Sequence, residues 1–421
     1  MIAKVLGKKA LGKVVVPPSK SYAHRGVIAA SLATGKSVIS NVAFSDDINA
    51  TIDAMILLGA KITKHLDYLE VEGIGNNFMN NDLEVFCNES GSTLRFLIPL
   101  FSLTNSKITF KGKNKLLKRP LNEYKKIFIE QGNHFYNDEN KVEIKGALKG
   151  GDIIINGNVS SQYITGLLFT IPLLNIDSII HIIPPFESKS YVDITIDLLK
   201  LFGIKCEYLD ELNILVKGNQ KYQAYDYRVE GDYSQAAFFL TLGAMNGEIE
   251  VLGLNKSSIQ GDKKIVDILR YSNVDIIELD DGYKVTSKNK IFMPTIDLKD
   301  IPDLGPILFV LATSSQNKVR FINTSRLTIK ESDRRSAMQI ELNKANIKLE
   351  ILDDDVIVYP NLVDLKEDLY SHLDHRIAMS NAILLVANNL EGIILDAEVV
   401  KKSYPNFYED LKNLGIDISF K

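Results

Sequence analysis

A structural repeat that recurs six times, about every 70 residues, constrains the fold of this chain more than any other feature. In each copy an amphipathic stretch typical of a helix leads through a Gly or Asn into a stretch typical of a strand. Gly and Asn tolerate the left-handed backbone conformation that closes a helix. The copies cover 47–62, 121–135, 192–208, 263–279, 334–351 and 406–420, with the closing residues Gly59, Gly132, Gly203, Asn273, Asn346 and Gly415.

A second kind of helix alternates with these amphipathic ones. Its sequence is apolar nearly all round, which predicts a buried helix, and a polar turn and a β-branched strand follow it. We expect the six turns at Thr34-Gly35, Asn105-Ser106, 175–177, Asn246-Gly247, 315–317 and 389–391. The Asp-rich segments 279–282 and 352–355 are typical of hairpin loops. The sequence therefore predicts six βαβαβ-like repeats, each with one buried and one amphipathic helix.

Six such repeats exceed one typical domain, so we expect two domains with three repeats each. A polar, tyrosine-rich stretch at 218–231 interrupts the pattern and is interpreted as one crossing between the domains, with the other near 16–20. The N-terminal segment 2–16 is interpreted as a short hairpin that belongs with the C-terminal half. The expected division is a discontinuous domain of 1–17 plus 229–421 and an inserted domain of 20–225.

Composition excludes several classes of function. A net charge of −4 over 421 residues argues against nucleic acid or an acidic membrane surface as the main partner. Cys87 and Cys206 are the only cysteines, which fits a reducing compartment and excludes a disulfide framework or a cysteine-based zinc site. The first residues lack the long apolar core of a signal peptide, and the apolar run 96–103 is too short to span a bilayer.

Polar side chains gather at the starts of the six buried helices, in 19–25, 89–95, 159–166, 231–237, 301–306 and 373–379. Capping explains one Ser or Asp per helix, but it does not explain Arg95 and Arg376, because the helix dipole disfavours a cation there. A buried cation is also costly unless an anion accompanies it. We therefore expect these helix starts to converge on bound anions. For Ser160, Ser161 and 232–234, capping alone is an equally good explanation.

Further cations lie near the same segments. Lys20 and Arg25 occur in the first buried helix, Arg119 precedes a proline, and 328–336 contains Lys330 and Arg334. Taken singly, each could be a solvated helix start with weak local ion pairs. Together they predict a ligand with several anionic groups, such as phosphate plus carboxylate, which the fork of arginine suits.

These segments resemble the motifs of one known family. PPSKSYAHR at 17–25 is similar to its P-x-S-K-S-x-x-x-R segment, and ESGSTLR at 89–95 to its N-x-G-T-x-x-R loop. KRPL, VSSQ, SKSYVDIT, IPD, IKESDR, DHRIAM and KKSYPNF follow in the family's order. Over essentially its whole length, the chain resembles the 5-enolpyruvylshikimate-3-phosphate (EPSP) synthases. The resemblance implies an α/β (α+β) fold, an inside-out α/β barrel of two domains, each with three βαβαββ units and buried helices, that closes over the substrates.

The resemblance also implies a reaction and a set of site residues. The reaction transfers the carboxyvinyl group of phosphoenolpyruvate to the 5-hydroxyl of shikimate 3-phosphate and releases phosphate, on the pathway to chorismate and the aromatic amino acids. The implied shikimate 3-phosphate residues are Lys20, Ser21, Arg25, Ser160, Ser161, Gln162, Ser188, Tyr191, Asp303, Arg326 and Lys330. The implied phosphoenolpyruvate residues are Lys20, Gly91, Arg119, Gln162, Arg334, Arg376 and Lys402. It further implies a cytoplasmic monomer that needs no metal or organic cofactor and whose partners are these two small molecules.

Asp303, Glu331 and Lys20 are the implied catalytic residues. Protonation of a vinyl carbon needs a well-placed acid, so we expect Glu331 to be partly desolvated with a raised pKa. Ionised Asp303 would accept the proton of the attacking hydroxyl. Lys20 and the arginines would steady phosphate and carboxylate and stabilise charge in the transition state.

Three positions depart from the family's pattern. Glu89 stands where Asn is frequent, and is expected to turn away from the anion or to pair with Arg95 or Arg119. Ser92 replaces a Thr, and Arg326 stands where some relatives carry an Asn that binds the substrate phosphate. Gly91 alone does not determine sensitivity to glyphosate, which occupies the phosphoenolpyruvate site in this family.

Two alternatives are open at this point. UDP-N-acetylglucosamine enolpyruvyl transferase shares the fold and the chemistry, but commonly has a Cys in the loop before an Arg-Pro, and 111–120 contains none. A non-catalytic anion-binding scaffold on the same fold is the second. It would be expected to have lost Asp303, Glu331 or Lys20, and all three are present.

Overall fold

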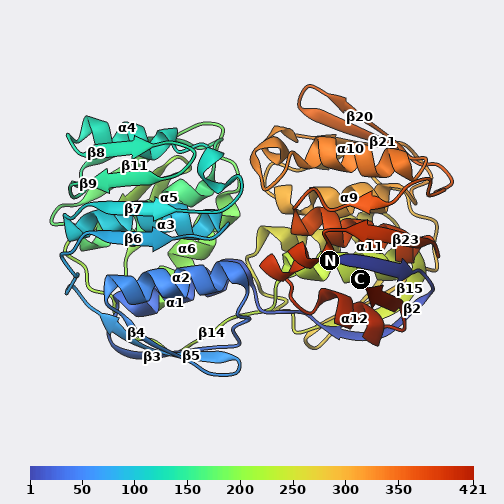
Figure 1. The fold of residues 1–421 in the computed structure, drawn as a ribbon, viewed down its shortest axis with the longest axis horizontal. Helices are drawn as coiled ribbons and strands as arrows, with labels where there is room; N and C mark the ends of the chain where they lie inside the picture. The colour runs from blue at the N-terminus through green and yellow to red at the C-terminus, as the bar shows by residue number, and fades with distance from the viewer. The chain divides into compact units, whose positions relative to one another are not determined.

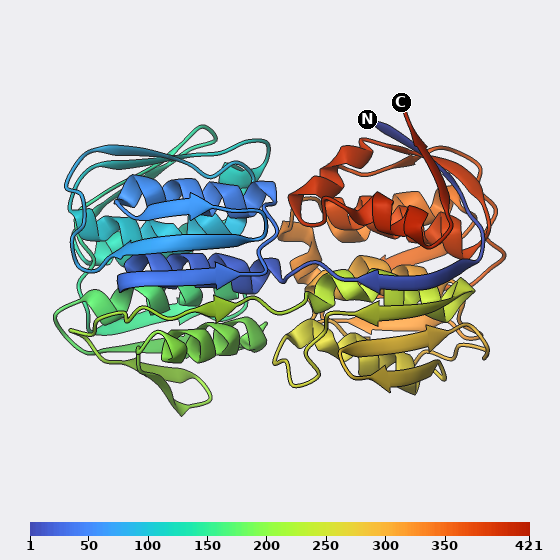
Figure 2. The same cartoon turned by 90° about the horizontal axis from the view of Figure 1, so that it is seen from below.

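The computed structural model describes residues 1–421, which divide into two compact units (Figure 1, Figure 2). The inserted unit is Lys20–Val229, and the terminal unit combines Met1–Ser19 with Glu230–Lys421. In the terminal unit the two chain ends lie side by side, because Ile2 and Lys421 exchange backbone hydrogen bonds of 2.9 and 3.0 Å. None of the helices is both long enough and apolar enough to cross a lipid bilayer.

The inserted unit contains three four-stranded sheets with the orders β14-β3-β5-β4, β6-β7-β9-β8 and β10-β11-β13-β12. In each sheet the first two strands are parallel and the others pair antiparallel. The strands are β3 (Thr34–Ser40), β4 (Lys61–Lys64), β5 (Tyr68–Ile74), β6 (Leu83–Phe86), β7 (Ile108–Lys111), β8 (His134–Asn137), β9 (Val142–Lys145), β10 (Asp152–Asn156), β11 (Ser178–Ile183), β12 (Cys206–Asp210), β13 (Asn213–Val216) and β14 (Tyr227–Arg228).

Each of these sheets is accompanied by one buried and one amphipathic helix, as the repeat predicts. The buried helices are α1 (Lys20–Leu32), α3 (Gly91–Phe101) and α5 (Ser161–Thr170). The amphipathic helices are α2 (Asp46–Leu58), α4 (Asn122–Glu130) and α6 (Lys189–Leu201). Short 3-10 turns occur at η1 (Ser102–Thr104), η2 (Leu116–Lys118) and η3 (Ile171–Leu173).

The terminal unit repeats this arrangement with the sheets β16-β17-β15-β2, β18-β19-β21-β20 and β22-β23-β1-β24. Its strands are β1 (Ile2–Leu6), β2 (Ala10–Val15), β15 (Gly247–Leu252), β16 (Asp275–Leu279), β17 (Gly282–Thr286), β18 (Ile296–Asp297), β19 (Val319–Ile322), β20 (Lys348–Leu352), β21 (Asp355–Tyr359), β22 (Leu369–Tyr370), β23 (Glu391–Leu395) and β24 (Asp417–Phe420). Its helices are α7 (Tyr233–Asn246), α8 (Lys264–Tyr271), α9 (Gly305–Ala312), α10 (Arg334–Lys344), α11 (His375–Ala387) and α12 (Phe407–Asn413), with 3-10 turns η4 (Gly261–Lys263), η5 (Pro302–Leu304), η6 (Ser325–Ile329) and η7 (Ala397–Lys402).

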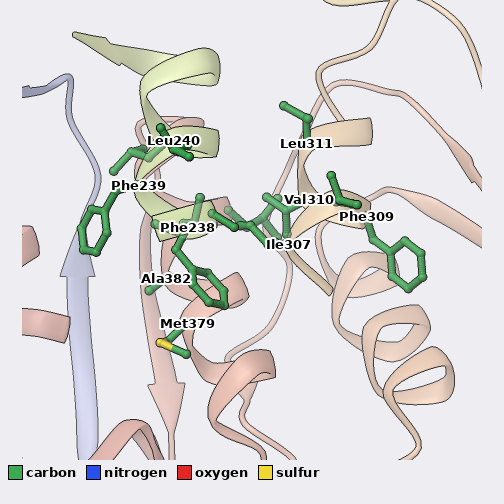
Figure 3. Close-up of a cluster of buried hydrophobic side chains, with 14 of the residues drawn as sticks. Phe238, Phe239, Leu240, Ile307, Phe309, Val310, Leu311, Met379 and Ala382 are labelled. Carbon is green, nitrogen blue, oxygen red and sulfur yellow. The ribbon is translucent and has the colours of Figure 1, made fainter. Parts of the chain in front are cut away.

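The buried helices α7, α9 and α11 pack together in the core of the terminal unit. Figure 3 shows their side chains lying among one another, with Phe238 from α7, Ile307 and Val310 from α9, and Met379 and Ala382 from α11. All five are fully buried. Burial of one such large apolar side chain contributes about 1.5–3 kcal/mol to folding. This packing holds the starts of the three helices in place, just before which Asp232, Asp303 and Asp374 lie.

The helix-closing residues and the hairpin loops of the repeats confirm the sequence pattern. Gly59, Gly132, Gly203, Asn273, Asn346 and Gly415 all have positive φ angles. The Asp-rich segments 279–282 and 352–355 connect β16 to β17 and β20 to β21. Local sequence preferences therefore determine where each amphipathic helix ends and how each hairpin turns.

Two of the six turns predicted after the buried helices are wrong. Thr34 and Gly35 already belong to β3 and pair with Ile74 and Gly73. Gly247 directly follows α7 and pairs with Ala10 as the first residue of β15. The polar character of these residues reflects the start of a strand, not a separate turn.

The predicted hairpin at 2–16 is also wrong, because its two strands belong to different sheets. β1 lies between β23 and β24 and is antiparallel to both, whereas β2 runs parallel to β15. β2 precedes α1 in the chain but completes the sheet that follows α7, and β14 precedes α7 but completes the sheet that follows α1. The chain thus passes from β2 in the terminal unit to α1 in the inserted unit, and from β14 in the inserted unit back to α7 in the terminal unit.

Candidate active site

In the inserted unit, serines and a lysine occupy the starts of the buried helices. Ser90 Oγ accepts a hydrogen bond from Thr93 N at 3.0 Å, and Ser160 Oγ accepts one from Gln162 N at 3.3 Å. Ser160 therefore caps α5, which is one of the two explanations, capping or ligand contact, that the sequence leaves open. Lys20 opens α1 and forms an ion pair of 2.9 Å with Asp47 in the first turn of α2.

Arg25 connects α1 to α6 through neutral acceptors. Its Nε donates to Thr195 Oγ1 at 2.8 Å, Nη1 to the Ser21 carbonyl at 2.7 Å and Nη2 to the Tyr191 carbonyl at 3.0 Å. The guanidinium lies 5.1 Å from the centre of the Phe96 ring and is only 2% exposed. Burial lowers the pKa of Arg25 to about 10. The structure thus brings Arg25 together with Ser21 and Tyr191, three of the residues that the resemblance implies for shikimate 3-phosphate.

Arg95, Gln162 and Arg119 surround Gly91 at the start of α3. Arg95 Nη1 donates to Gln162 Oε1 at 2.8 Å, and Gln162 Nε2 donates to Ser92 Oγ at 3.0 Å. Arg95 Nη2 donates to the Pro120 carbonyl at 3.2 Å, so its hydrogen-bond acceptors are neutral as well. Burial first, and then the charge of Arg119, lower the pKa of Arg95. Two guanidinium groups, those of Arg95 and Arg119, thus lie at this corner of the inserted unit.

Substitution of Gly91 by alanine tests the tightness of this corner. A β-carbon at this position would lie 2.8 Å from Arg119 Nη1, 3.5 Å from Gln162 Oε1 and 3.6 Å from Arg95 Nη1. The resemblance implies that this corner binds phosphoenolpyruvate. Because the guanidinium of Arg119 must move when the β-carbon is added, we expect Gly91→Ala to raise the KM for that substrate by roughly 10- to 100-fold. Steady-state kinetics measure this change, and the KM for shikimate 3-phosphate serves as the internal control. An unchanged KM for phosphoenolpyruvate would separate Gly91 from that substrate.

Ser188 and Ser161 complete the predicted residues of the inserted unit. Ser188 precedes α6 with φ 53° and ψ 40°, a left-handed conformation that costs a non-glycine residue about 1 kcal/mol or more. Both serine side chains are buried. Strain of this kind persists where the surrounding structure requires it, and such positions cluster at functional sites.

The terminal unit brings a second group of predicted residues together around Asp303. Asp303 Oδ1 lies 3.2 Å from Lys330 Nζ and 3.0 Å from Arg334 Nη1, and Oδ2 lies 3.1 Å from Arg376 Nη2. Burial raises the pKa of Asp303, but Arg376, Lys330 and Arg334 outweigh it and hold that pKa well below its usual range. Asp303 is therefore ionised at neutral pH.

Arg334, in the first turn of α10, joins three carboxylates. It lies 2.8 Å from Glu331 Oε2 and 2.8 Å from Asp374 Oδ2, in addition to Asp303. Its side chain is 1% exposed, and that of Asp374 is fully buried. Burial lowers the pKa of Arg334, but Asp374, Glu331 and Asp303 together raise it above its ordinary value. Glu331 is 18% exposed, in keeping with the partial desolvation expected for it.

Lys330, Arg326 and Lys402 extend the basic part of this group. Burial lowers the pKa of Lys330, Asp303 raises it, and the neighbouring charge of Arg326 lowers it further. Arg326 is buried in η6, four residues before Lys330, and its positive charge disfavours the protonated form of Lys330. Lys402 ends η7 and donates from Nζ to the Leu373 carbonyl at 3.0 Å, just before the start of α11.

The charge argument made from the sequence needs one correction. Buried Arg334 and Arg376 do not require a bound anion, because Asp303, Glu331 and Asp374 supply the negative charge. Asp232 likewise caps α7 by accepting from Gln235 N at 3.2 Å. In the inserted unit, by contrast, the hydrogen bonds of the buried Arg25 and Arg95 go to neutral acceptors.

Sequence reasoning missed Asp47 and Asp374. Asp47 holds Lys20, and Asp374 both caps α11 and binds Arg334. Each is an Asp at a helix start, and Asp is one of the residues preferred there for capping alone. Their second contact is made by a residue far away in the chain, so the local sequence carries no separate signal for it.

Comparisons with known proteins give the same family as the sequence motifs. The sequence model of the family described as EPSP synthase (3-phosphoshikimate 1-carboxyvinyltransferase) matches residues 6–411. The 3-phosphoshikimate 1-carboxyvinyltransferase of Clostridium perfringens (strain ATCC 13124) is 45% identical over 409 residues, which cover 97% of this chain and 96% of that protein. That of Clostridioides difficile (strain 630) is 43% identical over 425 residues, covering 98% and 97%.

Solved structures show the same fold. EPSP synthase from Acinetobacter baumannii superimposes with a TM-score of 0.81 at 21% identity, covering 100% of both chains. The enolpyruvyl transferase NikO from Streptomyces tendae superimposes with a TM-score of 0.79 at 14% identity, covering 99% of this chain and 98% of that one. The fold class predicted from the sequence is therefore confirmed. By the extent of the sequence match, this chain belongs to the EPSP synthase (3-phosphoshikimate 1-carboxyvinyltransferase) family.

Proposed function

We propose that this chain transfers the carboxyvinyl group of phosphoenolpyruvate to the 5-hydroxyl of shikimate 3-phosphate and releases phosphate. The observation that carries the proposal is the ionised carboxylate of Asp303, held among Lys330, Arg334 and Arg376 beside Glu331. A carboxylate in reach of three cations is suited to accept a proton while the cations bind anionic substrates. The names of the relatives favour this reaction over transfer to UDP-N-acetylglucosamine.

Residues proposed for shikimate 3-phosphate occur both in the inserted unit and in the terminal unit. In the inserted unit, hydroxyls and cations with neutral partners, such as Ser160 and Arg25, suit a phosphate and a polyol. In the terminal unit, Asp303, Lys330 and Arg326 would contact it. The full proposed set is Lys20, Ser21, Arg25, Ser160, Ser161, Gln162, Ser188, Tyr191, Asp303, Arg326 and Lys330.

Phosphoenolpyruvate carries a phosphate and a carboxylate, and arginine binds both by paired hydrogen bonds. The corner around Gly91, with Arg119 and Gln162, is proposed for one of these groups. Arg334 and Arg376 are proposed for the other. The full proposed set is Lys20, Gly91, Arg119, Gln162, Arg334, Arg376 and Lys402.

The proposed reaction proceeds by addition and elimination. The substrate oxygen attacks C2 of phosphoenolpyruvate, Asp303 accepts the hydroxyl proton and Glu331 donates a proton to C3, which gives a tetrahedral ketal with a methyl group. The C2–O bond to phosphate then breaks, and loss of one methyl proton restores the double bond. Glu331, ionised by the first step, is proposed to accept that proton. Asp303, protonated by the first step, passes its proton to the departing phosphate, so phosphate leaves as hydrogen phosphate and both carboxyl groups regain their starting protonation states.

The ion pair between Glu331 and Arg334 affects whether Glu331 can act as the proton donor. A carboxylate 2.8 Å from a guanidinium favours its ionised form. An anionic substrate group bound to Arg334 would replace Glu331 as the partner of that guanidinium. Glu331 could then hold the proton that it must donate, so substrate binding itself would prepare the acid.

The proposed setting is the cytoplasm, with the chain acting as a monomer on small molecules. Both cysteines, Cys87 and Cys206, are free thiols, which accords with a reducing compartment. The reaction as proposed requires no metal or organic cofactor, because proton transfer and anion binding are supplied by side chains.

A phosphate-release assay tests the function directly. Purified protein is expected to release phosphate from phosphoenolpyruvate only when shikimate 3-phosphate is also present. UDP-N-acetylglucosamine in its place is the matched control and is expected to give no release. Release that depends on UDP-N-acetylglucosamine, and not on shikimate 3-phosphate, would reverse the assignment of the acceptor.

A further inference from the structure

Four polar side chains in the core of the inserted unit form a continuous series of hydrogen bonds, the hydroxyl chain, which has no part in the function proposed above. His24 Nδ1 lies 2.7 Å from Thr51 Oγ1, which lies 2.7 Å from Thr93 Oγ1. Thr93 Oγ1 in turn donates to Ser90 Oγ at 2.7 Å. All four residues are fully buried. Buried polar groups of this kind are costly unless they are hydrogen-bonded, so each member of the chain depends on its neighbours.

The hydroxyl chain connects the starts of three helices. His24 lies in α1 one turn after Lys20, and Thr51 lies in α2 one turn after Asp47. Because residues four apart share a helix face, the bond from His24 to Thr51 lies one turn along from the ion pair of 2.9 Å between Lys20 and Asp47. Thr93, in the first turn of α3, also donates to the Asp47 carbonyl at 3.4 Å. The chain thereby ties Lys20 and Asp47 to the start of α3.

Ser90 is the residue at which the hydroxyl chain reaches the corner around Gly91. It immediately precedes α3, and its Oγ accepts from Thr93 N at 3.0 Å, so it caps the helix. The next two residues, Gly91 and Ser92, belong to the corner itself, where Ser92 Oγ accepts from Gln162 Nε2 at 3.0 Å. The position of Ser90 therefore sets where the backbone of this corner lies.

The acceptors along the hydroxyl chain determine the tautomer of His24. The Asp47 carbonyl can only accept, and Ser90 Oγ accepts from Thr93 N, so the Thr93 hydroxyl is the donor toward both. Thr93 then accepts from Thr51, and Thr51, which has a single hydroxyl proton, accepts from His24 Nδ1. The other ring nitrogen, Nε2, is buried without a hydrogen-bond partner, which a lone pair tolerates better than an N–H. The proton of His24 is therefore on Nδ1.

The surroundings of His24 also favour a neutral ring. Burial, and then the positive charges of Lys20 and Arg25 in the same helix, lower the pKa of His24 well below its ordinary value. A protonated ring would carry an N–H at Nε2 that has no acceptor, which is costly in a buried position. A neutral imidazole with one fixed donor is thus the form that completes the hydroxyl chain.

We propose that His24 is a positioning residue for phosphoenolpyruvate: its Nδ1–H sets the direction of the hydroxyl chain that holds the start of α3 against Lys20 and Asp47. Without that donor the hydroxyls of the chain can turn, and the cap before Gly91 loses its fixed position. This inference rests on the roles proposed above for Lys20 and Gly91. A His24 that only fills space would affect stability alone, and its folded variants would bind phosphoenolpyruvate alike.

The test compares His24→Asn with His24→Gln. The amide nitrogen of asparagine is as many bonds from Cα as Nδ1 of histidine, whereas that of glutamine is as many bonds away as Nε2. We expect H24Q to raise the KM for phosphoenolpyruvate by roughly tenfold, the effect of one lost buried hydrogen bond, and to change kcat less than about threefold. H24N is expected to stay within about threefold of wild type in both constants. Steady-state phosphate release measures them.

The two substrates separate positioning from a general loosening of the unit. A KM for phosphoenolpyruvate in H24Q that is equal to or lower than in H24N would overturn the proposal. A rise in the KM values of phosphoenolpyruvate and shikimate 3-phosphate by the same factor would also contradict it. His134→Gln, at an exposed position of the same unit, is the matched control and should leave both KM values unchanged.

Thr51 provides a second pair of variants that leaves His24 intact. Thr51→Val keeps the shape of threonine but removes the hydroxyl that joins His24 to Thr93, whereas Thr51→Ser keeps the hydroxyl. We expect T51V to raise the KM for phosphoenolpyruvate by roughly tenfold and T51S to change it little. A wild-type KM in T51V refutes the proposal even where neither His24 variant folds.

The tautomer itself gives a readout that uses no substrate. The chain has six histidines, and comparison of 15N-histidine NMR spectra of wild type and H24N assigns the signals of His24. We expect a protonated Nδ1 and an unprotonated Nε2. A spectrum with the proton on Nε2 refutes the inference whatever the activity. Absence of phosphate release by wild type would instead refute the proposed function, and with it the substrate role of His24.

Discussion

Replacing Asp303 with asparagine is expected to lower the turnover number by roughly 100- to 10,000-fold, the range typical of a lost general base. Asparagine has nearly the same shape but cannot accept the hydroxyl proton of shikimate 3-phosphate. The charge of Asp303 also orients Lys330, Arg334 and Arg376, each within 3.2 Å. The KM values should change much less than turnover if proton transfer is its main contribution, and steady-state phosphate release measures both.

The same substitution is expected to reduce stability. Asp303 is the shared partner of three cations, and the side chains of Arg334 and Arg376 are 1% and 5% exposed. Removal of one partner from a buried ion pair leaves an uncompensated charge and costs about 3 kcal/mol or more. Urea denaturation measures this loss, so activity should be compared below the unfolding transition.

Asp297→Asn is a matched control for Asp303→Asn. Asp297 lies at the exposed end of β18, where it accepts from Lys299 N and Asn323 Nδ2, both of which asparagine can still serve. We expect wild-type turnover and a stability within about 0.5 kcal/mol of wild type for this control. If D303N retains the turnover number of wild type, Asp303 has no role in proton transfer.

Replacing Glu331 with glutamine is expected to lower turnover by a comparable factor, roughly 100- to 10,000-fold. Glutamine cannot donate a proton to C3 of phosphoenolpyruvate or accept one from the ketal methyl group. It keeps a hydrogen-bond acceptor for Arg334, 2.8 Å away, so substrate affinity should change far less. Glu367→Gln, an exposed position of the same unit, is the control and should behave as wild type.

Turnover in deuterated water gives this prediction a second readout. Addition of a solvent-derived proton to C3, followed by loss of a methyl proton, places deuterium in the vinyl group of product and of recovered phosphoenolpyruvate. NMR spectroscopy should detect this label with wild type and little of it with E331Q. Wild-type turnover and labelling in E331Q would remove Glu331 from the acid–base role.

Local sequence patterns predicted the repeats of this fold well. Gly59, Asn273 and Gly415 close amphipathic helices with positive φ angles, as their side chains allow. The apolar composition of α7, α9 and α11 predicted that they would be buried. Such features depend on contacts within a few turns of chain, where each residue's preference acts directly.

Strand partners were less predictable. The sequence predicts β1 as one arm of a hairpin, but β1 pairs with β23 and β24 at the other end of the chain. Alternating apolar residues indicate that a strand has a buried face, and they do not specify which neighbour it pairs with. The sequence of β2 alone therefore does not predict that β2 pairs with β15, and the sequence of β14 alone does not predict that β14 pairs with β3.

The sequence by itself determined the six repeats, the family and the residue types available for anion binding and proton transfer. Only the tertiary structure decided which carboxylates pair with the cations: Asp374 and Asp303 with Arg334, and Asp47 with Lys20. It also decided that Arg25 and Arg95 have neutral acceptors alone. The physical reason is that charge balance depends on distance in space, and residues far apart in the chain become neighbours only when the sheets and helices pack.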